Sequence, residues 1–233
     1  MAHEMGHYLA CRYYDVDCTL PFFLPFPPIV SVSGTLGAVI RIREPFPNRR
    51  ALFDIGIAGP IAGFVALVPL LALAVSRSTV LAAVPHGPGT IYFGEPLLFK
   101  GLVWLKFGAL SDAFELNLHP IGFAAWFGML ATAWNLLPFG QFDGGHLAYA
   151  TLGDRSRHVS VVTVGVAAIM CFVSINWIVM TLVMAAMLYF MGSRHPSVVN
   201  EYEPLGSGRY ALAVFAVIMF VLCFTPVPIR VVT

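Results

Sequence analysis

The hydrophobic positions of this chain fall into long runs that short polar segments separate. Runs close to the length of a membrane-crossing helix, about 20 residues, cover residues 51–76, 119–137 and about 210–225. Two further runs, 158–174 and 175–191, predict a tight helical pair that turns at 174–176. Residues 1–14 predict the C-terminal half of another membrane helix. The pattern therefore indicates an all-α polytopic membrane protein with about five to six transmembrane helices.

Residues 19–43 carry a different pattern, because prolines interrupt their first half and a β-branched, glycine-punctuated run fills residues 30–40. Proline lacks a backbone N–H and breaks helices, so this segment predicts short strands or an irregular hairpin. A strand edge cannot face lipid, so we expect the hairpin to be membrane-associated but packed on protein or lining a cavity. We interpret residues 77–96 as a loop and residues 97–110 as an interfacial or re-entrant helix. A short helix is expected to end near Leu152.

Composition supports the membrane interpretation. Hydrophobic residues make up 58% of the 233 residues and charged residues only 11%, whereas soluble proteins have about 25% charged residues. A net charge of +1 and the lack of a basic cluster give no indication of a nucleic-acid partner. The four cysteines are scattered without a CxxC pair, which favours packing roles over a disulfide or metal framework.

His3, Glu4 and His7 form a His-Glu-x-x-His pattern at the start of the chain. Residues four apart on a helix share a face, so both imidazoles can bind one metal ion. Glu4 lies beside them, where its carboxylate can accept a proton from water. This combination is typical of zinc hydrolases, although the five residues alone also arise by chance. Only Met1 and Ala2 precede His3, so we expect the N-terminal part of this helix upstream of residue 1.

Asp143 is the candidate third ligand, since a catalytic zinc ion normally has three protein ligands and an open position. It stands alone after an apolar run, and a carboxylate at membrane depth is costly enough to indicate function. We expect Gly144 and Gly145 to let the backbone approach a metal or a substrate closely. The alternative for Asp143 is a helix N-cap. For His146, three residues later, packing is a simpler interpretation than metal binding.

Positive charges favour one orientation in the membrane. If the first helix ends in the cytosol, nine arginines lie on the cytosolic side and four basic residues on the other. The nine are Arg12, Arg41, Arg43, Arg49, Arg50, Arg155, Arg157, Arg194 and Arg209, and the four are Arg77, Lys100, Lys106 and Arg230. The same threading places the histidine pair and Asp143 toward one leaflet, on the cytosolic side.

These motifs together resemble the site-2 protease family of intramembrane zinc metalloproteases, in particular its compact bacterial and chloroplast branch without a PDZ domain. The resemblance rests on His3-Glu4-Met5-Gly6-His7, Ala58-Gly59-Pro60, Asn135-Leu136-Leu137-Pro138 and Phe142-Asp143-Gly144-Gly145. It covers nearly the whole chain. One departure is Phe142, where the family usually has leucine.

The resemblance implies a zinc metalloendopeptidase that hydrolyses peptide bonds within or near transmembrane segments, as in regulated intramembrane proteolysis. It implies one Zn²⁺ held by His3, His7 and Asp143, with Glu4 as the catalytic base. Asn135 would help to hold substrate or transition state, although it could instead satisfy backbone near Pro138. Ser33, Gly34 and Thr35 of the hairpin would pair with an unwound substrate strand.

The resemblance also implies a single membrane-embedded metalloprotease domain over residues 1–233. Its partners would be transmembrane protein substrates and the lipid bilayer. We expect a multi-pass protein of the bacterial inner membrane, with an organellar membrane as the alternative location. Two other functions remain open: a metal-binding membrane transporter, which predicts further acids or histidines along a path, and an inactive scaffold. The intact His3, Glu4, His7 and Asp143 argue against the scaffold.

Overall fold

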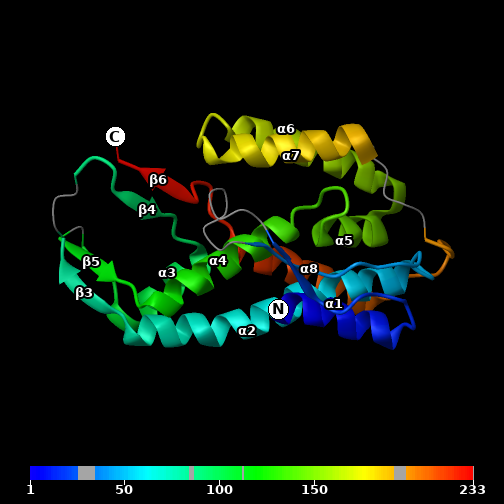
Figure 1. The fold of residues 1–233 in the computed structure, drawn as a ribbon, viewed down its shortest axis with the longest axis horizontal. Coiled ribbons are helices and arrows are strands. Elements are labelled where there is room, and N and C mark those ends of the chain that lie inside the picture. The colour runs from blue at the N-terminus through cyan, green and yellow to red at the C-terminus, as the bar shows by residue number, and fades with distance from the viewer. Residues whose placement is uncertain (26–34, 84–86, 112, 192–197, 233) are drawn as a thin grey trace.

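The computed structural model describes residues 1–25, 35–83, 87–111, 113–191 and 198–232 (Figure 1). Within these ranges the chain is mostly helical, as the apolar runs predicted. Its α-helices are α1 (Ala2–Tyr13), α2 (Arg49–Arg77), α3 (Leu97–Phe107), α4 (Pro120–Asn135), α5 (Asp143–Leu152), α6 (Ser156–Met170), α7 (Asn176–Met191) and α8 (Ser207–Cys223). A short 3-10 helix, η1 (Gly153–Arg155), joins α5 to α6.

Three two-stranded antiparallel sheets accompany the helices. They pair β1 (Phe22–Pro25) with β2 (Thr35–Val39), β3 (Thr79–Ala82) with β5 (Phe114–Asn117), and β4 (Ile91–Phe93) with β6 (Ile229–Val231). The first pair confirms the strands predicted within residues 19–43. The loop predicted at residues 77–96 is wrong in part, because β3 and β4 lie there. Each finds its partner far along the chain, so the local sequence carries no hairpin signal.

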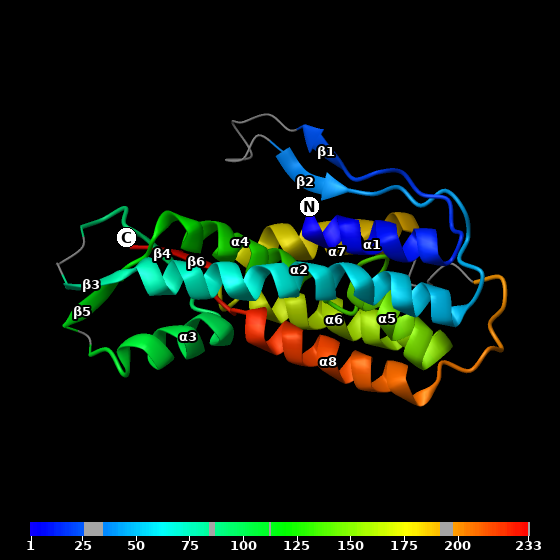
Figure 2. The same ribbon diagram turned by 90° about the horizontal axis from the view of Figure 1, so that it is seen from below.

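The long helix α2 organises the fold. It begins after Asn48, whose side-chain oxygen accepts a hydrogen bond from the N–H of Ala51 over 2.8 Å, as a helix N-cap does. Two prolines, Pro60 and Pro69, lie inside it. Helices α1, α3, α4, α5 and α8 all contact α2, which runs along the length of the molecule in Figure 2. The elements that carry the candidate site are therefore assembled on one helix.

One helix of the described residues, α2, is both long and apolar enough to cross a membrane, while most of α7 and all of α8 are apolar but shorter. At 1.5 Å per residue, the 29 residues of α2 reach about 44 Å, against about 30 Å for a bilayer's hydrocarbon core. The 17 residues of α8 reach only about 26 Å. The predicted number of five to six transmembrane helices therefore stays a prediction.

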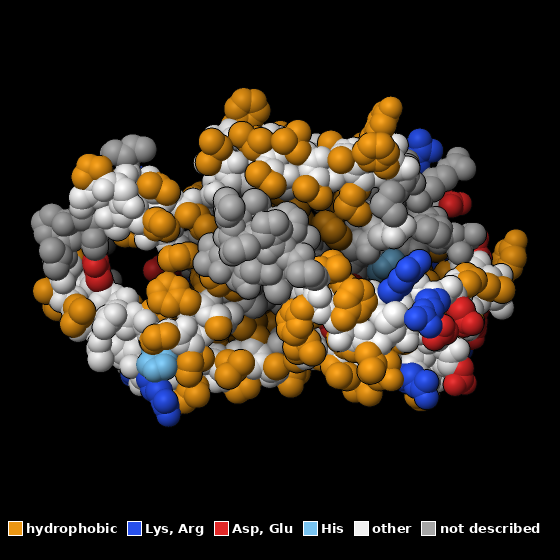
Figure 3. Space-filling model, in the orientation of Figure 1, with side chains coloured by type: hydrophobic (Ala, Val, Ile, Leu, Met, Phe, Trp, Pro, Cys, Tyr) orange, Lys and Arg blue, Asp and Glu red, His pale blue; other side chains and the backbone are white. Residues whose placement is uncertain are grey.

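Helices α6 and α7 form a layer of their own above the other helices in Figure 1, in which α6 contacts both α7 and α5. Buried Phe139, Ala167, Trp177 and Met184 form the small core between this layer and the rest. On the face shown in Figure 3, hydrophobic side chains cover much of this layer, while most visible Lys and Arg side chains gather where α1 ends and α2 begins. On this face most of the positive charge therefore lies at one end, which we call the charged end.

Candidate metal centre

Helices α1 and α2 approach each other at glycines, which brings the first helix unusually close to the second. A Cβ atom at Gly6 would lie 2.3 Å from the carbonyl oxygen of Ala58. A Cβ atom at Gly59 would lie 2.1 Å from Nε2 of His7. Only hydrogen at these two positions leaves room for the backbone of α2 and for the imidazole ring. The two glycines therefore make the space in which His7 lies.

The ring of His7 is buried and held by the backbone of α2. Its Nδ1 lies 2.7 Å from the carbonyl oxygen of Ile55. Because a carbonyl oxygen only accepts, Nδ1 must carry the hydrogen and donate it. The other ring nitrogen, Nε2, then presents its lone pair. This is the arrangement in which metal-binding histidines are usually held, with the second nitrogen fixed by a backbone or carboxylate acceptor.

The structure brings together the three residues that the sequence predicted as ligands. Nε2 of His3 lies 3.1 Å from Nε2 of His7. The carboxylate of Asp143 faces both rings, with Oδ2 3.1 Å from Nε2 of His3 and Oδ1 3.3 Å from Nε2 of His7. All three ligand atoms lie within 4.8 Å of one another, and no second group of this kind occurs among the described residues.

These residues fit a zinc ion. Oδ2 of Asp143 is buried and has no hydrogen-bond partner within the described parts of the chain, although Nε2 of His3 is near. A buried carboxylate oxygen without a partner is costly unless another group completes its environment. Two imidazole nitrogens and one carboxylate oxygen are donors that zinc prefers, and three such donors leave a coordination position open.

Asp143 reaches this point because α5 begins there. Negative charge is stabilised at the first turn of a helix, where the helix dipole is positive. The two following glycines have a packing role. A Cβ atom at Gly144 would lie 2.2 Å from the carbonyl oxygen of Leu136, and one at Gly145 would lie 2.2 Å from that of Gly140. They let α5 pack on the preceding turn of its own chain, while the predicted approach to a metal or a substrate stays a prediction.

Glu4 stands next to the three ligands but outside their group. Its Oε1 lies 3.9 Å from Nε2 of His3, and its side chain is 15% exposed. The carboxylate is thus near the metal donors without occupying a position among them. That placement suits a group that moves protons.

The family model of peptidase family M50 matches residues 1–179, which is most of the chain. The chain belongs to peptidase family M50. This match spans His3, Glu4, His7 and Asp143, so the residues that converge in the structure all lie within the matched part. No solved structure matches the chain.

Among curated proteins, this M50 chain is 31% identical over 236 residues to "Probable zinc metalloprotease EGY1, chloroplastic" of Arabidopsis thaliana, covering 97% of this chain and 40% of that protein. It is 32% identical over 187 residues to the EGY2 protein of Oryza sativa subsp. indica, covering 76% and 33%. It is 28% identical over 244 residues to EGY3 of the same plant, covering 96% and 39%. The chain therefore spans between a third and two fifths of the length of these relatives.

The residues predicted to bind substrate are placed only in part. Asn135, the last residue of α4, has its Nδ2 3.2 Å from Nε2 of His3, so it lies beside the metal donors of this M50 chain. Thr35 begins β2, while Ser33 and Gly34 lie outside the described residues. Figures 1 and 2 both place the β1–β2 hairpin beside the N-terminal end of α1, the end that carries His3.

His146 has a packing role and does not lie among the metal donors. Its ring packs against Phe46 with 5.8 Å between ring centroids, and its Cβ would lie 3.2 Å from a Cβ atom at Gly56. The packing role predicted for it agrees with this geometry. The carbonyl of Ile55, which holds the ring of His7, could not be predicted from the sequence, because a backbone acceptor has no side-chain signal.

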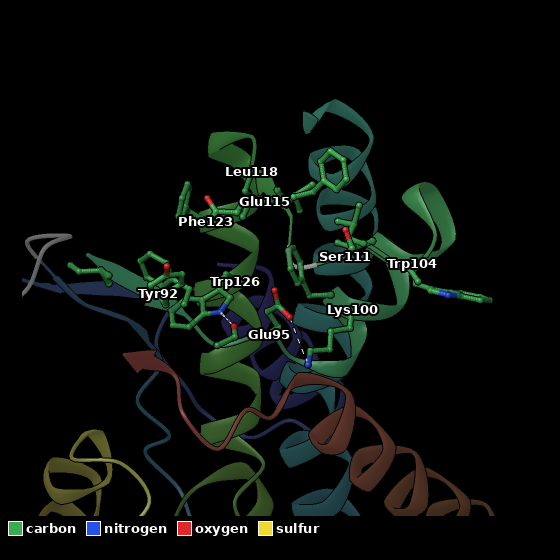
Figure 4. A pocket seen from close by; sticks show the side chains of 18 of the residues that line it. Tyr92, Glu95, Lys100, Trp104, Ser111, Glu115, Leu118, Phe123 and Trp126 are labelled. Carbon is green, nitrogen blue, oxygen red and sulfur yellow. Dashed lines mark hydrogen bonds and ion pairs between the residues drawn. The ribbon is translucent and has the colours of Figure 1, made fainter. Parts of the chain in front are cut away.

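A cavity of about 690 Å³ lies elsewhere in the molecule, between α3, α4 and the short strands (Figure 4). Glu95 and Lys100 form an ion pair on its wall, with 3.7 Å between Oε2 and Nζ. The indole N–H of Trp126 donates to the carbonyl of Gly94 over 2.7 Å. None of the lining residues belongs to the metal-ligand group, so this cavity is separate from the candidate metal centre.

Proposed function

We propose that this M50 chain hydrolyses peptide bonds within or near transmembrane segments of membrane proteins, with one zinc ion held by His3, His7 and Asp143. The observation that carries the proposal is the convergence of these three side chains on one point with Glu4 beside them. The names of the plant relatives, each a probable zinc metalloprotease, support the same metal and reaction. The chain covers only part of those relatives, so its activity is proposed from its own residues and is not taken from the names of the relatives.

Zinc, when bound, would polarise a substrate carbonyl and lower the pKa of water. The residues of the chain carry out the proton transfers and hold the reacting groups in place. Glu4 accepts the proton of the attacking water and returns it to the leaving amine, so one carboxylate serves as base and then as acid. His7 keeps its orientation through Ile55 while charge changes around it. The amide of Asn135 is near enough to His3 to donate to the oxyanion that forms on the substrate.

The exposed apolar surface of the chain indicates the class of substrate. Large apolar side chains on α7 and in the turn that precedes it are highly exposed, among them Tyr189 at 84% and Phe172 at 94%. A water-soluble protein rarely exposes so much apolar surface, whereas a lipid-facing protein does. We therefore propose that the chain is a multi-pass membrane protein and that its substrates lie in the same bilayer.

A helical substrate segment must unwind before hydrolysis, because its peptide bonds are engaged in helix hydrogen bonds. Within the described residues the β1–β2 sheet has two strands, so it has outer edges to offer. We propose that an unwound substrate strand adds to this hairpin, as peptides do when they extend a sheet edge. Thr35 belongs to this surface by its position at the start of β2.

The proposed orientation in the membrane is supported by contacts that arginines make with residues far along the chain. Arg49 donates to the carbonyl of Ala150, Arg50 pairs with Glu203, and Arg209 pairs with Asp54. These contacts gather positive charge at the end where α2 begins, while Arg77 marks its other end. Such asymmetry favours the cytosol for the charged end. We propose the bacterial inner membrane as the location, because the names that include the chloroplast are those of the plant relatives.

The deciding experiment is Glu4→Gln in purified, zinc-loaded protein with a single-span model substrate. Zinc content should stay near one per chain, while cleavage falls by about 10²–10⁴-fold because the amide accepts no proton. Glu44→Gln is the matched control, since this exposed carboxylate accepts a hydrogen bond from the N–H of Asp17 and is not among the converging residues. Undiminished cleavage by Glu4→Gln would refute the mechanism. Undiminished metal flux in vesicles without any cleavage would favour the transporter.

A further inference from the structure

Asp54 joins three elements at the charged end of the molecule. Its carboxylate receives Arg209 of α8 through two hydrogen bonds, Nε to Oδ1 at 2.8 Å and Nη2 to Oδ2 at 2.6 Å. The hydroxyl of Tyr14, the residue that follows α1, donates to the same Oδ2. Asp54 itself lies in α2, so one side chain connects the end of α1 with α2 and α8.

The geometry of this contact is well defined. Arg209 engages the carboxylate with two parallel hydrogen bonds, the arrangement that fixes both position and direction. Its Nη1 also donates to the carbonyl of Leu205 over 3.1 Å, which holds the guanidinium group against the segment that precedes α8. Both side chains are 26% exposed, so water screens the pair less than it screens a surface pair.

This three-residue contact is adjacent to the support of the metal centre. Asp54 immediately precedes Ile55, whose carbonyl holds Nδ1 of His7. Helix α1 is therefore attached to two consecutive residues of α2, through His7 near its middle and through Tyr14 at its end. Two attachments separated by two helical turns oppose both rotation and sliding of α1, and they add to the close packing of Gly6 on Ala58.

We propose that Asp54, with Arg209 and Tyr14, is a positioning group for the metal centre. It holds α1 on α2 in the one register that brings Ile55 to His7 and presents Nε2 of His7 toward Asp143. The inference rests on the zinc site of the proposed function, and it adds residues that act through His7 without contacting the metal. Loss of the carboxylate would loosen this register and weaken metal binding.

The test measures zinc affinity by chelator competition on the full chain in detergent. Asp54→Asn should weaken binding by about 10–100-fold, the effect usual for groups that orient a metal ligand. Glu203→Gln is the matched control. It removes the same charge from the 2.9 Å pair with Arg50, which also ties α2 to the segment before α8 but lies further from His7. The proposal is overturned if Asp54→Asn binds zinc like the wild type, or if both variants lose affinity equally.

A second variant and a second measurement separate positioning from folding. Tyr14→Phe keeps the ion pair and should weaken zinc binding by about 2–10-fold, the value of one hydrogen bond. Nitrogen NMR of zinc-free protein should show His7 protonated at Nδ1 in the wild type and a mixture of tautomers in Asp54→Asn. An unchanged His7 spectrum overturns the proposal. If the wild type binds no zinc at all, the proposed function fails, whereas the NMR comparison still tests the role of Asp54.

Discussion

His7 and Ile55 are separated by 48 positions in the chain, yet Nδ1 of the histidine lies 2.7 Å from the carbonyl oxygen of the isoleucine. This hydrogen bond selects the tautomer in which Nε2 faces His3 and Asp143. It also means that the metal centre depends on the backbone of α2, which contributes no ligand. Changes on α2 should therefore affect zinc binding directly.

Gly59→Ala should abolish zinc binding and cleavage, because the new Cβ atom would lie 2.1 Å from Nε2 of His7. The backbone of α2 cannot move away easily, so the ring has to leave its place. We expect more than about 100-fold weaker zinc binding with helix content preserved, measured by metal analysis and circular dichroism. Gly101→Ala in α3 is the control, since its Cβ meets nothing within 4 Å. Normal zinc content in Gly59→Ala would show that His7 is not a ligand.

Asp143→Asn should produce a protein whose activity zinc does not restore. Chelation should inactivate wild type and variant alike, and added zinc should reactivate only the wild type, because an amide replaces the one anionic donor. Asp154→Asn in η1 removes an exposed carboxylate nearby in sequence and should reactivate normally. Reactivation of Asp143→Asn at equal zinc concentrations would contradict the proposed ligand set.

Gly37→Ala should impair cleavage while leaving zinc binding intact. Gly37 lies in β2 with φ of 102°, a conformation that other residues adopt only with strain of about 1–3 kcal/mol. We expect roughly a tenfold or larger loss of kcat/KM for a membrane substrate, because the hairpin geometry changes. Gly89→Ala introduces the same strain at φ of 90° outside the hairpin. Equal losses in both variants would argue against substrate binding by the hairpin.

Tyr149→Phe should reduce stability by about 1 kcal/mol at neutral pH and change its alkaline dependence. Burial, and then the hydrogen bond to Glu201 at 2.7 Å, raise the pKa of Tyr149 to about 12. The ordinary value is about 10, so this stabilisation is complete below about pH 10 and is lost as pH rises toward 12. Unfolding measured from pH 9 to 12 should show a shallower decline in Tyr149→Phe. Tyr202→Phe, at a side chain 98% exposed, is the control.

The sequence was sufficient for the parts of the site that local spacing determines. His3, Glu4 and His7 lie on one helix, and the spacing of four between the histidines alone placed the two rings on one face. Asp143 could be found because an isolated carboxylate in apolar sequence is costly. The helix limits were also visible, since long apolar runs have few alternative interpretations.

The rest depends on contacts that no local pattern records. The partners of β3 and β4 lie far along the chain, and strands of three or four residues show almost no periodicity. The pair between Asp54 and Arg209 spans 155 positions. Gly144 and Gly145 were correctly marked as sites of close approach, but the sequence could not show that the approaching atoms belong to the chain itself.

The order of the donors along the chain has a consequence for biosynthesis. His3 and His7 need only α1 and α2, two consecutive helices, to reach their final arrangement. Asp143 emerges from the ribosome later, by several seconds at about 5–20 residues per second. A nascent chain therefore carries its histidine pair and Glu4 without the third donor until α5 has docked. With the proposed ligand set, the site is complete only once α5 has docked, so hydrolysis cannot begin before most of the chain has been made.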